Sequence, residues 1–257
     1  MFTFRRANKY VPIGKNFLLN KRTNREGYYF KKDIASCSHV IGYKGSVPER
    51  RTEAENCAIP MFEIACHPVK RYEDNLFSMR RAIYMGKMAI KKTEDTEIFN
   101  SMRTACRKSK IVETNNLSMD DFFEAFALIQ EHDLDVKRIA IHPCNVEKFK
   151  HVTKEYFKPN FKWLAKRTGC IGTLLGAKVY KSLRMYPDEI FFSSHPRVVG
   201  VIPRKGGIKK KRIEMAKELR EGYICWEKIG IAIANDYTIS KIKLEKTDEY
   251  NDMSYPL

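Results

Sequence analysis

Hydrophobic residues recur in the middle of the chain at the spacing of an amphipathic helix. After His67-Pro68, apolar side chains follow at intervals of four, three, four and seven residues, at Tyr72, Leu76, Met79, Ile83 and Ile90. This spacing predicts one long helix. The pattern then stops, because residues 91–97 (KKTEDTE) are all polar and no aliphatic side chain follows until Ile98. A soluble helix normally keeps one apolar face, so this polar collar either ends the helix or contacts something outside its own core.

Two strand-like runs precede this helix. They cover residues 28–43 (YYFKKDIASCSHVIGY) and 57–66 (CAIPMFEIAC), and a polar, charged stretch, KGSVPERRTEAEN, separates them. This is the pattern of a long β-hairpin with an exposed tip, longer than compact domains usually carry. We therefore expect the hairpin to be covered by another molecule or to be mobile.

Helix and strand signals alternate in the second half of the chain. Ser118, followed by two aspartates, predicts a helix N-terminus, because a hydroxyl caps free amides and carboxylates favour the helix dipole. Residues 136–143 (VKRIAIHP) predict a short buried strand, and Asn145 predicts the start of another helix. Residues 172–182 (GTLLGAKVYKS) predict a single strand with alternating faces, and residues 190–202 predict a further extended run.

The C-terminal part combines a basic segment with strands. Residues 205–222 (KGGIKKKRIEMAKELREG) predict a basic loop that leads into a short helix, which Gly222 can stop. Residues 223–245 predict two strands that turn at Asn235-Asp236. Taken together, the patterns indicate an α+β fold.

The net charge of +17 is concentrated in two segments. Residues 1–51 hold 12 Lys and Arg against 3 Asp and Glu (+9), and residues 203–220 hold 8 against 2 (+6), which leaves +2 for the rest. Two basic segments on a nearly neutral body indicate a polyanionic partner, most often nucleic acid. The alternative is an unengaged basic surface with a flexible arm. Neither segment resembles a sequence-reading motif, so we expect any nucleic-acid binding to be nonspecific.

Composition excludes several other classes of protein. Apolar residues at 43% and aromatic residues at 12% argue against a disordered chain. No apolar run is long enough to span a membrane, and the N-terminus lacks the apolar stretch of a secretion signal. Seven scattered cysteines fit reduced thiols in a cytoplasm better than a disulfide framework.

No grouping of residues indicates catalysis or a cofactor. Cys37 with His39, and Cys57 with Cys66 and His67, lack the close-paired spacing of a zinc site. The paired histidines of a metalloprotease helix and the ending of a phosphate-binding loop are also absent. We therefore expect no catalytic residues, no metal and no cofactor, and a protein that is not an enzyme.

The order of short phrases along the chain is more specific. A basic arm and a long hairpin are followed by IPMFEI (residues 59–64), a long helix with TEDTEIF (93–99), the stretch GTLLGAKVYKS, and closing strands around EKIGIAIAND (227–236). This order resembles that of the major capsid proteins of tailed bacteriophages, whose fold is shared with bacterial encapsulins. The resemblance covers nearly the whole chain and is most convincing over residues 58–102 and 169–244.

The resemblance implies a phage major capsid fold with four parts. Residues 1–27 would be the N-terminal arm, and residues 28–70 the extended β-hairpin loop that lies across a neighbouring subunit. Residues 71–111 and 223–247 would form the peripheral domain, with its spine helix and β-sheet. Residues 112–222 would form an α/β axial domain around the capsomer centre. Because the chain begins with Met1, we expect a separate scaffold protein or none.

The implied function is self-assembly into hexamers and pentamers of an icosahedral shell around double-stranded DNA. The subunit would meet many copies of itself in a virion capsid assembled in the host cytoplasm, with portal, scaffold or decoration proteins as further partners and no membrane. Predicted inter-subunit contacts are Arg50, Arg51, Glu53, Lys91, Lys92, Glu94, Asp95 and Glu97. Predicted contacts with the genome or an acidic partner are Arg5, Arg6, Lys9, Lys15, Lys209, Lys210, Lys211 and Arg212.

This interpretation gives the polar collar a role. Lys91 and Lys92 can pair with Asp95 along the helix, for roughly 0.2–0.5 kcal/mol each, which leaves the two glutamates for basic residues at a neighbour's hairpin tip. A helix end capped by Thr93 is the alternative. Two other classes of protein also remain open: an encapsulin-like compartment with protein cargo, and a small nonspecific nucleic-acid-binding protein.

Overall fold

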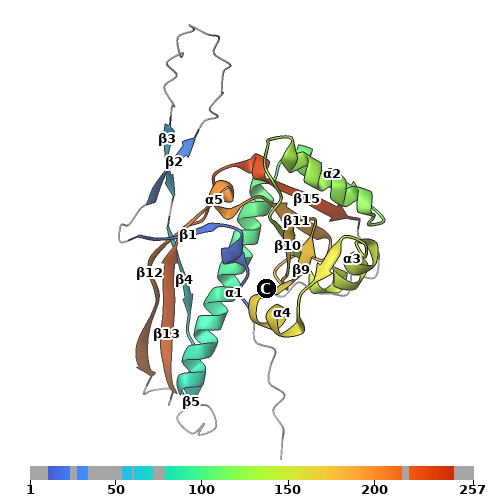
Figure 1. The fold of residues 1–257 in the computed structure, drawn as a ribbon. Helices are drawn as coiled ribbons and strands as arrows, with labels where there is room; N and C mark the ends of the chain where they lie inside the picture. Colours follow the sequence, from blue (N-terminus) through green and yellow to red (C-terminus); the bar gives the residue numbers. More distant parts are fainter. Residues whose placement is uncertain are drawn as a thin grey trace, which may run out of the picture.

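The computed structural model describes residues 11–23, 28–33, 54–59, 61–71, 79–215 and 220–245. In these segments the chain is α+β, and one long helix lies between two sheets (Figure 1). A third sheet, of two strands, projects from one end of the molecule (Figure 1).

The first layer is a six-stranded sheet that packs on helix α1 (Figure 1). Its strands run in the order β1-β12-β13-β4, while β14 pairs with β12 and β5 pairs with β13. The neighbouring strands are antiparallel except for β1 and β12, which are parallel. The bounds are β1 Leu19–Thr23, β4 Phe62–Cys66, β5 Val69–Arg71, β12 Gly200–Met215, β13 Arg220–Ile229 and β14 Ala232–Ile233.

Helix α1 (Met79–Ala105) runs through the polar collar without a break. In its N-terminal half, Ile90 packs on apolar residues of β4 and β13. Gly86 allows this close approach, because a Cβ at that position would lie 3.2 Å from the Cys225 sulfur. In its C-terminal half, Phe99 packs edge-to-face on Phe17, with ring centroids 5.6 Å apart. The prediction of one long helix is therefore confirmed from Met79 onward, while residues 72–78 lie outside the described residues. The alternative, a helix end at the collar, is excluded.

The second layer is a seven-stranded sheet in the order β6-β15-β11-β7-β10-β9-β8. Its strands are β6 Ile111–Thr114, β7 Arg138–Ile141, β8 Phe157–Pro159, β9 Cys170–Leu174, β10 Ala177–Lys181, β11 Glu189–Ser193 and β15 Ile239–Leu244. The helices of this half are α2 Met119–Gln130, α3 Val146–Val152, α4 Lys162–Thr168 and α5 Pro196–Val199.

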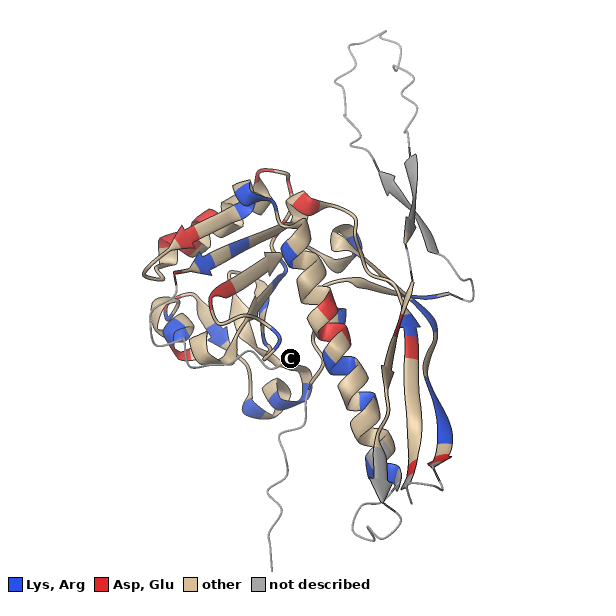
Figure 2. Ribbon diagram, turned by 180° about the vertical axis from the view of Figure 1, so that it is seen from behind, with Lys and Arg blue, Asp and Glu red and all other residues tan. Residues whose placement is uncertain are grey.

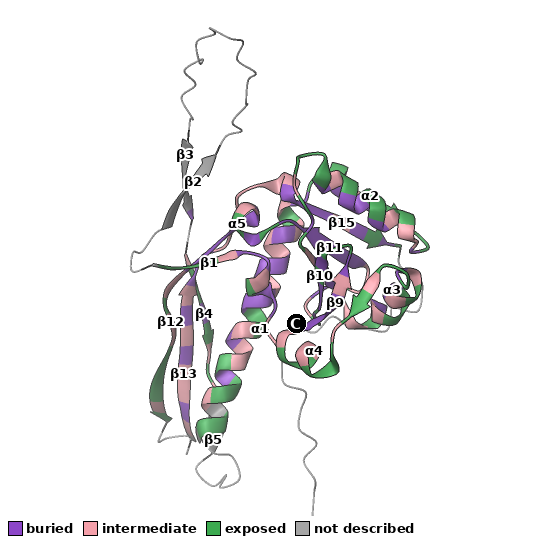
Figure 3. Ribbon diagram, in the orientation of Figure 1, coloured by how far each residue is buried: buried purple, intermediate pink, exposed green. Residues whose placement is uncertain are grey.

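Both faces of the seven-stranded sheet are covered, which explains its nearly continuous burial (Figure 3). On β11, Phe192 packs towards α2, where it meets Phe122 edge-to-face at 5.8 Å. The adjacent Phe191 points to the opposite face and joins the core shared with α1. Side chains along a strand alternate between faces, so a strand covered on both sides is buried at every position and is mainly apolar, as the central residues of β11 are.

The predicted helix start at Ser118 is confirmed in detail. The Ser118 hydroxyl accepts from the Asp121 amide, and the Asp121 carboxylate accepts from the Ser118 amide at 2.7 Å, which is a capping box. Asn145 also precedes a helix as predicted. Its side-chain amide, however, donates to the Pro187 carbonyl instead of capping that helix.

The hairpin prediction is confirmed for its base. Strands β2 (Tyr28–Asp33) and β3 (Ala54–Ile59) pair antiparallel, from Tyr28 opposite Ile59 to Asp33 opposite Ala54. The predicted second run is two strands, because β3 ends at Ile59 and β4 begins at Phe62. Residues 34–53, with the predicted contacts Arg50, Arg51 and Glu53, lie outside the described residues.

Several local predictions were wrong. Residues 172–182 are not one strand: β9 and β10 form a hairpin that turns at Leu175 and Gly176, whose φ angles of +48° and +84° suit a two-residue type I′ turn. The basic stretch 205–215 is not a loop but part of strand β12, which pairs with β13. The extended run 190–202 is interrupted by the short helix α5.

The sheets also divide the chain differently from the predicted domains. The predicted boundary at residue 222 falls inside the β12–β13 pair, so both strands belong to the six-stranded sheet on α1. Strand β15, which was expected in that same sheet, instead pairs with β11 and β6 in the seven-stranded sheet. Asn235 and Asp236 therefore lie between two different sheets rather than in a hairpin turn.

Candidate functional site

The polar collar contains a buried ion cluster. The Arg204 guanidinium of β12 binds both carboxylate oxygens of Glu94 and donates to Glu227 of β13 at 2.9 Å. It also donates to the Asn20 side-chain oxygen of β1, again at 2.9 Å. Glu94 is 5% exposed and Glu227 4%. We call these four residues the Arg204 cluster; it joins α1 to three strands of the six-stranded sheet.

The environment of Arg204 favours the protonated, positively charged guanidinium. Burial disfavours a charged guanidinium, but the hydrogen bond and charge of Glu94, together with those of Glu227, outweigh burial and raise the pKa of Arg204. The cluster carries one positive and two negative charges. It is therefore a fixed charged junction inside the subunit.

Asp95 anchors the N-terminal segment to the same helix. Its carboxylate accepts hydrogen bonds from the backbone amides of Ile13 and Gly14, each at 2.9 Å, and the side chain is 0% exposed. Gly14 is required here, because a Cβ at this position would lie 2.7 Å from the Asp95 carboxylate. With Phe17 and Leu18 also buried, residues 11–23 are part of the body of the subunit rather than a free arm.

The collar therefore works differently from the prediction. Glu94 and Asp95 are buried against partners within the chain, so the prediction that they contact another subunit was wrong. Their partners lie 81 to 110 residues away in sequence, which a local pattern does not show. Lys92 is exposed, Lys91 and Glu97 are half-buried, and their role between subunits stays a prediction.

The predicted basic contacts fall into two groups. Arg5, Arg6 and Lys9 lie outside the described residues, whereas Lys15 is exposed next to the anchored segment. The run 209–212 is exposed along β12, and Figure 2 shows Lys and Arg along this strand. Within this run, Arg212 pairs with Glu214 and Glu221 at 3.0 and 3.1 Å.

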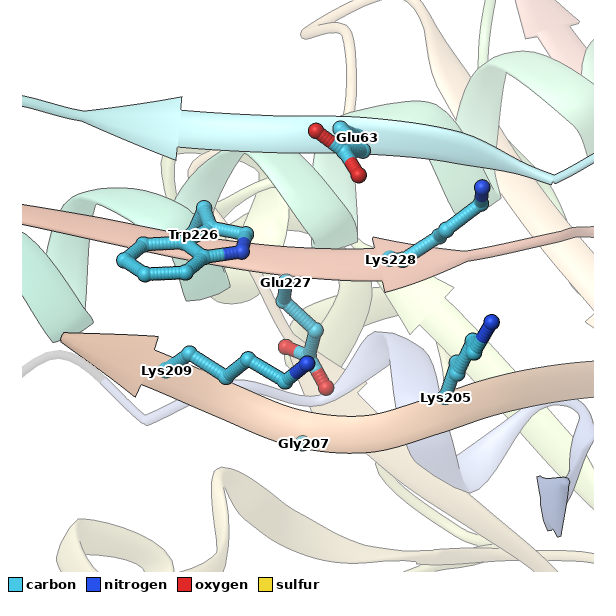
Figure 4. A pocket seen from close by; sticks show the side chains of 7 residues that line it. All are labelled: Glu63, Lys205, Gly207, Lys209, Trp226, Glu227 and Lys228. Carbon is cyan, nitrogen blue, oxygen red and sulfur yellow. The ribbon is translucent and has the colours of Figure 1, made fainter. Parts of the chain in front are cut away.

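A shallow pocket lies on the six-stranded sheet beside this run. Figure 4 shows Trp226 on the middle strand β13, with Lys205 and Lys209 of β12 on one side and Glu63 of β4 on the other. Lys228 lies on β13 between Lys205 and Glu63 in the strand register. Apart from Lys209, these lining residues were not predicted. Charged side chains alternate between the two faces of these strands, and this alternation could have found them. It could be used only after β12 had been recognised as a strand.

Two strongly exposed aromatic side chains lie on the half of the molecule that contains the seven-stranded sheet. Phe161 and Trp163, at the start of α4, are 76% and 62% exposed, and α4 is mostly green in Figure 3. Leu183, after β10, is 65% exposed. Large apolar side chains in water are candidates for contact with another protein surface.

The described residues offer little for other chemistry. Among them, no group of three or more His, Cys, Asp or Glu side chains could hold a metal ion. The helices of the described segments include none with the length and apolar character needed to cross a membrane.

Similarity to known proteins is found in three dimensions rather than in sequence. Neither a protein-family model nor a curated protein matches the sequence. A structure from Microbacterium phage Oxtober96 is 11% identical, with a TM-score of 0.69 over 95% of each chain. The capsid of cyanophage P-SCSP1u is 10% identical, with a TM-score of 0.69 over 96% of this chain and 93% of that one.

A compartment protein is also similar. The chain of the holo-SrpI encapsulin complex from Synechococcus elongatus is 12% identical, with a TM-score of 0.64 over 92% of this chain and 91% of that one. The protein thus has an α+β major capsid fold, the fold of tailed-phage capsid proteins that encapsulins share. The resemblance expected from the order of sequence phrases is confirmed at the level of the fold.

Proposed function

We propose that this protein is a major capsid protein, which assembles into hexamers and pentamers of an icosahedral shell around double-stranded DNA. The fold supports this proposal, since the phage and encapsulin chains above match it over nearly their whole length. In such a shell, α1 and the six-stranded sheet would form the peripheral part, and the seven-stranded sheet the part nearer the capsomer centre.

The β2–β3 hairpin is the observation that carries the proposal. These two strands form a sheet of their own and pair with no third strand among the described residues. An isolated two-stranded hairpin is marginally stable in water, and three strands or packing on another element are normally needed. A hairpin that projects from the body (Figure 1) is stabilised if it lies on a neighbouring subunit.

The charge supports DNA as the content of the shell. Many copies at +17 repel each other at close range, so a closed shell requires counter-charge. Duplex DNA supplies about one negative charge per 1.7 Å of axis. In this proposal the particle is a virion capsid assembled in the host cytoplasm, with scaffold, portal or decoration proteins as additional partners.

An encapsulin-like compartment is the second candidate, because the fold also matches the SrpI encapsulin. The two functions differ in content: a capsid holds nucleic acid, whereas an encapsulin holds protein cargo. A basic net charge favours the first.

Electron microscopy and sizing of the purified full-length protein test the proposal. We expect closed particles or capsomer rings of megadalton mass, with DNA that is protected from nuclease when the protein is made with its packaging partners. Particles that hold only protein would favour the compartment. A species of 30.1 kDa, or about twice that, would contradict both and favour a small nucleic-acid-binding protein.

A further inference from the structure

The run 209–212 has two faces, and only one of them is directed away from α1. Cys225 of β13 packs towards α1, next to Gly86, and it lies opposite Lys210 in the strand register. Directly opposed residues share a face, so Lys210 is on the α1 side, and so is Arg212 two residues later. Lys209 and Lys211 are therefore on the outer side, opposite Trp226 and Ile224.

Other lysines continue this outer side. Arg204 faces α1 because it binds Glu94, so the next residue, Lys205, faces outward, and Lys21 of β1 lies level with Pro203 on the same side. Lys228 is opposite Lys205 across the β12–β13 pair. We call this set the outer lysine face: Lys21, Lys205, Lys209, Lys211 and Lys228.

Negative charge on this face is scarce. Among the described residues, the strand register places Glu63 of β4 on it, and Glu227, which Arg204 binds, also lines the pocket. Among the described residues, no carboxylate lies within salt-bridge distance of Lys209, Lys211 or Lys228. Lys205 and Lys228 are directly opposed, so the register places two lysines side by side on this face.

The shape of the face suits a large polyanion. The pocket beside Trp226 has a volume of about 150 Å³, which is below the ≈300–1,000 Å³ typical of small-molecule sites. Lysines two positions apart on one strand are separated by roughly 6.6 Å, so they present a row of point charges along an open surface. Such a row follows a phosphate backbone and does not read bases.

We propose that the outer lysine face contacts the backbone of duplex DNA, and that Lys210 and Arg212 of the same run do not. This inference rests on the proposed capsid function and adds to it which side of the six-stranded sheet is turned towards the packaged genome. Arg212 already pairs with two glutamates, which reduces its availability to phosphate. Lys210 is level with Cys225, and the charges of Lys210 and of Lys87 on α1 both act on the Cys225 thiol.

The test compares two variants that each lose two positive charges. Lys209→Gln/Lys211→Gln changes the outer lysine face, and Lys87→Gln/Lys210→Gln changes the α1 side. Binding of the unassembled full-length chain to a 30-base-pair duplex is measured by fluorescence anisotropy between 50 and 300 mM salt. Each lost phosphate contact lowers the slope of log K against log salt by about 0.9, so we expect a decrease of about 2 for the outer variant and a roughly tenfold or greater loss of affinity at 0.1 M salt.

The control variant should keep the wild-type slope and affinity within about a factor of three. Equal losses in the two variants, or an unchanged slope for Lys209→Gln/Lys211→Gln, would overturn the proposal. Circular dichroism of each variant confirms that the sheet is intact. Assembly is scored separately by electron microscopy and sizing. A chain that forms neither particles nor capsomer rings contradicts the capsid function, while the contrast between the two faces still decides this inference.

Discussion

At the residue scale, the Arg204 side chain joins its own strand to three other elements. Its guanidinium reaches α1, β13 and β1 from β12, and the two carboxylates that it binds are almost fully buried. Buried ion pairs add little net stability compared with apolar residues, but removing one partner is costly because a buried charge is left unpaired. The main effect of losing Arg204 would therefore be two buried carboxylates without a cation.

We predict that Arg204→Met lowers the free energy of unfolding by about 3–5 kcal/mol, because Glu94 and Glu227 would both be left buried without a cation. Glu94→Gln should cost less, since Arg204 keeps Glu227. Urea unfolding of the unassembled subunit measures both. Arg107→Met is the matched control: its pair with Asp236 is largely exposed, so it should change stability by about 0–1 kcal/mol. An Arg204 variant no less stable than this control would contradict the role of the cluster.

Cys106 gives a prediction in pH. Burial raises the pKa of its thiol from 9.0 to about 11, although the nearby Lys241 acts in the opposite direction. The unfolded chain can lose this proton from about pH 9, whereas the folded chain cannot until about pH 11. Stability from the neutral thiol is thus complete below pH 9 and is lost as pH rises to 11, by roughly 2–3 kcal/mol at about 1.4 kcal/mol per pKa unit.

The measurement is the pH dependence of unfolding in urea for wild type and Cys106→Ala. Other groups titrate in both proteins, so their difference isolates the thiol. We expect the alanine variant to be less stable at pH 7 because it leaves a small cavity, and the gap to narrow between pH 9 and 11. A constant gap across this range would contradict the raised pKa.

At the element scale, α1 is held by charged contacts at two places. Glu94 and Asp95 tie its middle to the six-stranded sheet and to the N-terminal segment. Nearer its end, Arg103 binds Glu189 of β11 at 2.6 Å, and Lys241 of β15 binds the same carboxylate at 3.1 Å. The helix can be polar all round in the collar because other elements of the same chain supply partners.

Asp95→Ala tests the anchor of the N-terminal segment. The change leaves the amides of Ile13 and Gly14 without their acceptor, and each buried unsatisfied donor costs about 1–3 kcal/mol. We expect hydrogen exchange in residues 11–23 to become at least tenfold faster, with little change in α2 or the seven-stranded sheet. Thr93→Ala, on the exposed side of the same helix, is the control and should leave exchange unchanged. Equal protection in the two variants would show that apolar packing alone holds the segment.

The sequence predicted elements with a local signal and failed where the partner is distant. The 3.6-residue spacing before Ile90 and the capping pattern at Ser118 depend on neighbouring residues, and both predictions are confirmed. Strand β12 was missed because its lysines and the Gly206-Gly207 pair have low strand propensity, while nine residues of β13 provide the pairing. The Arg204 cluster was missed because its four members come from four different elements, so no local pattern connects them.

At the scale of the whole molecule, the two large sheets share α1 and the N-terminal segment in their cores, whereas the β2–β3 hairpin has a sheet to itself. The body of the subunit therefore has what it needs to fold alone. Under the proposed function, the hairpin is the part that a neighbouring subunit would stabilise, so changes in it should separate folding from assembly.

Replacing residues 34–53 with Asn-Gly tests this separation. Asp33 and Ala54 are directly opposed in the strand register, and Asn-Gly is the preferred two-residue connection of such a pair. The removed segment carries three basic and two acidic residues, so the net charge changes by only one. We expect the shortened subunit to keep its circular dichroism spectrum and a Tm within a few degrees of wild type. It should form at least tenfold fewer particles by electron microscopy, because in the proposed shell the full-length hairpin joins neighbouring subunits. A variant that removes one exposed basic residue from the body outside the outer lysine face, Lys154→Gln, controls for charge and should assemble normally. Wild-type particle yield from the shortened chain would mean that the hairpin does not join subunits, and lost folding would mean that it belongs to the body after all.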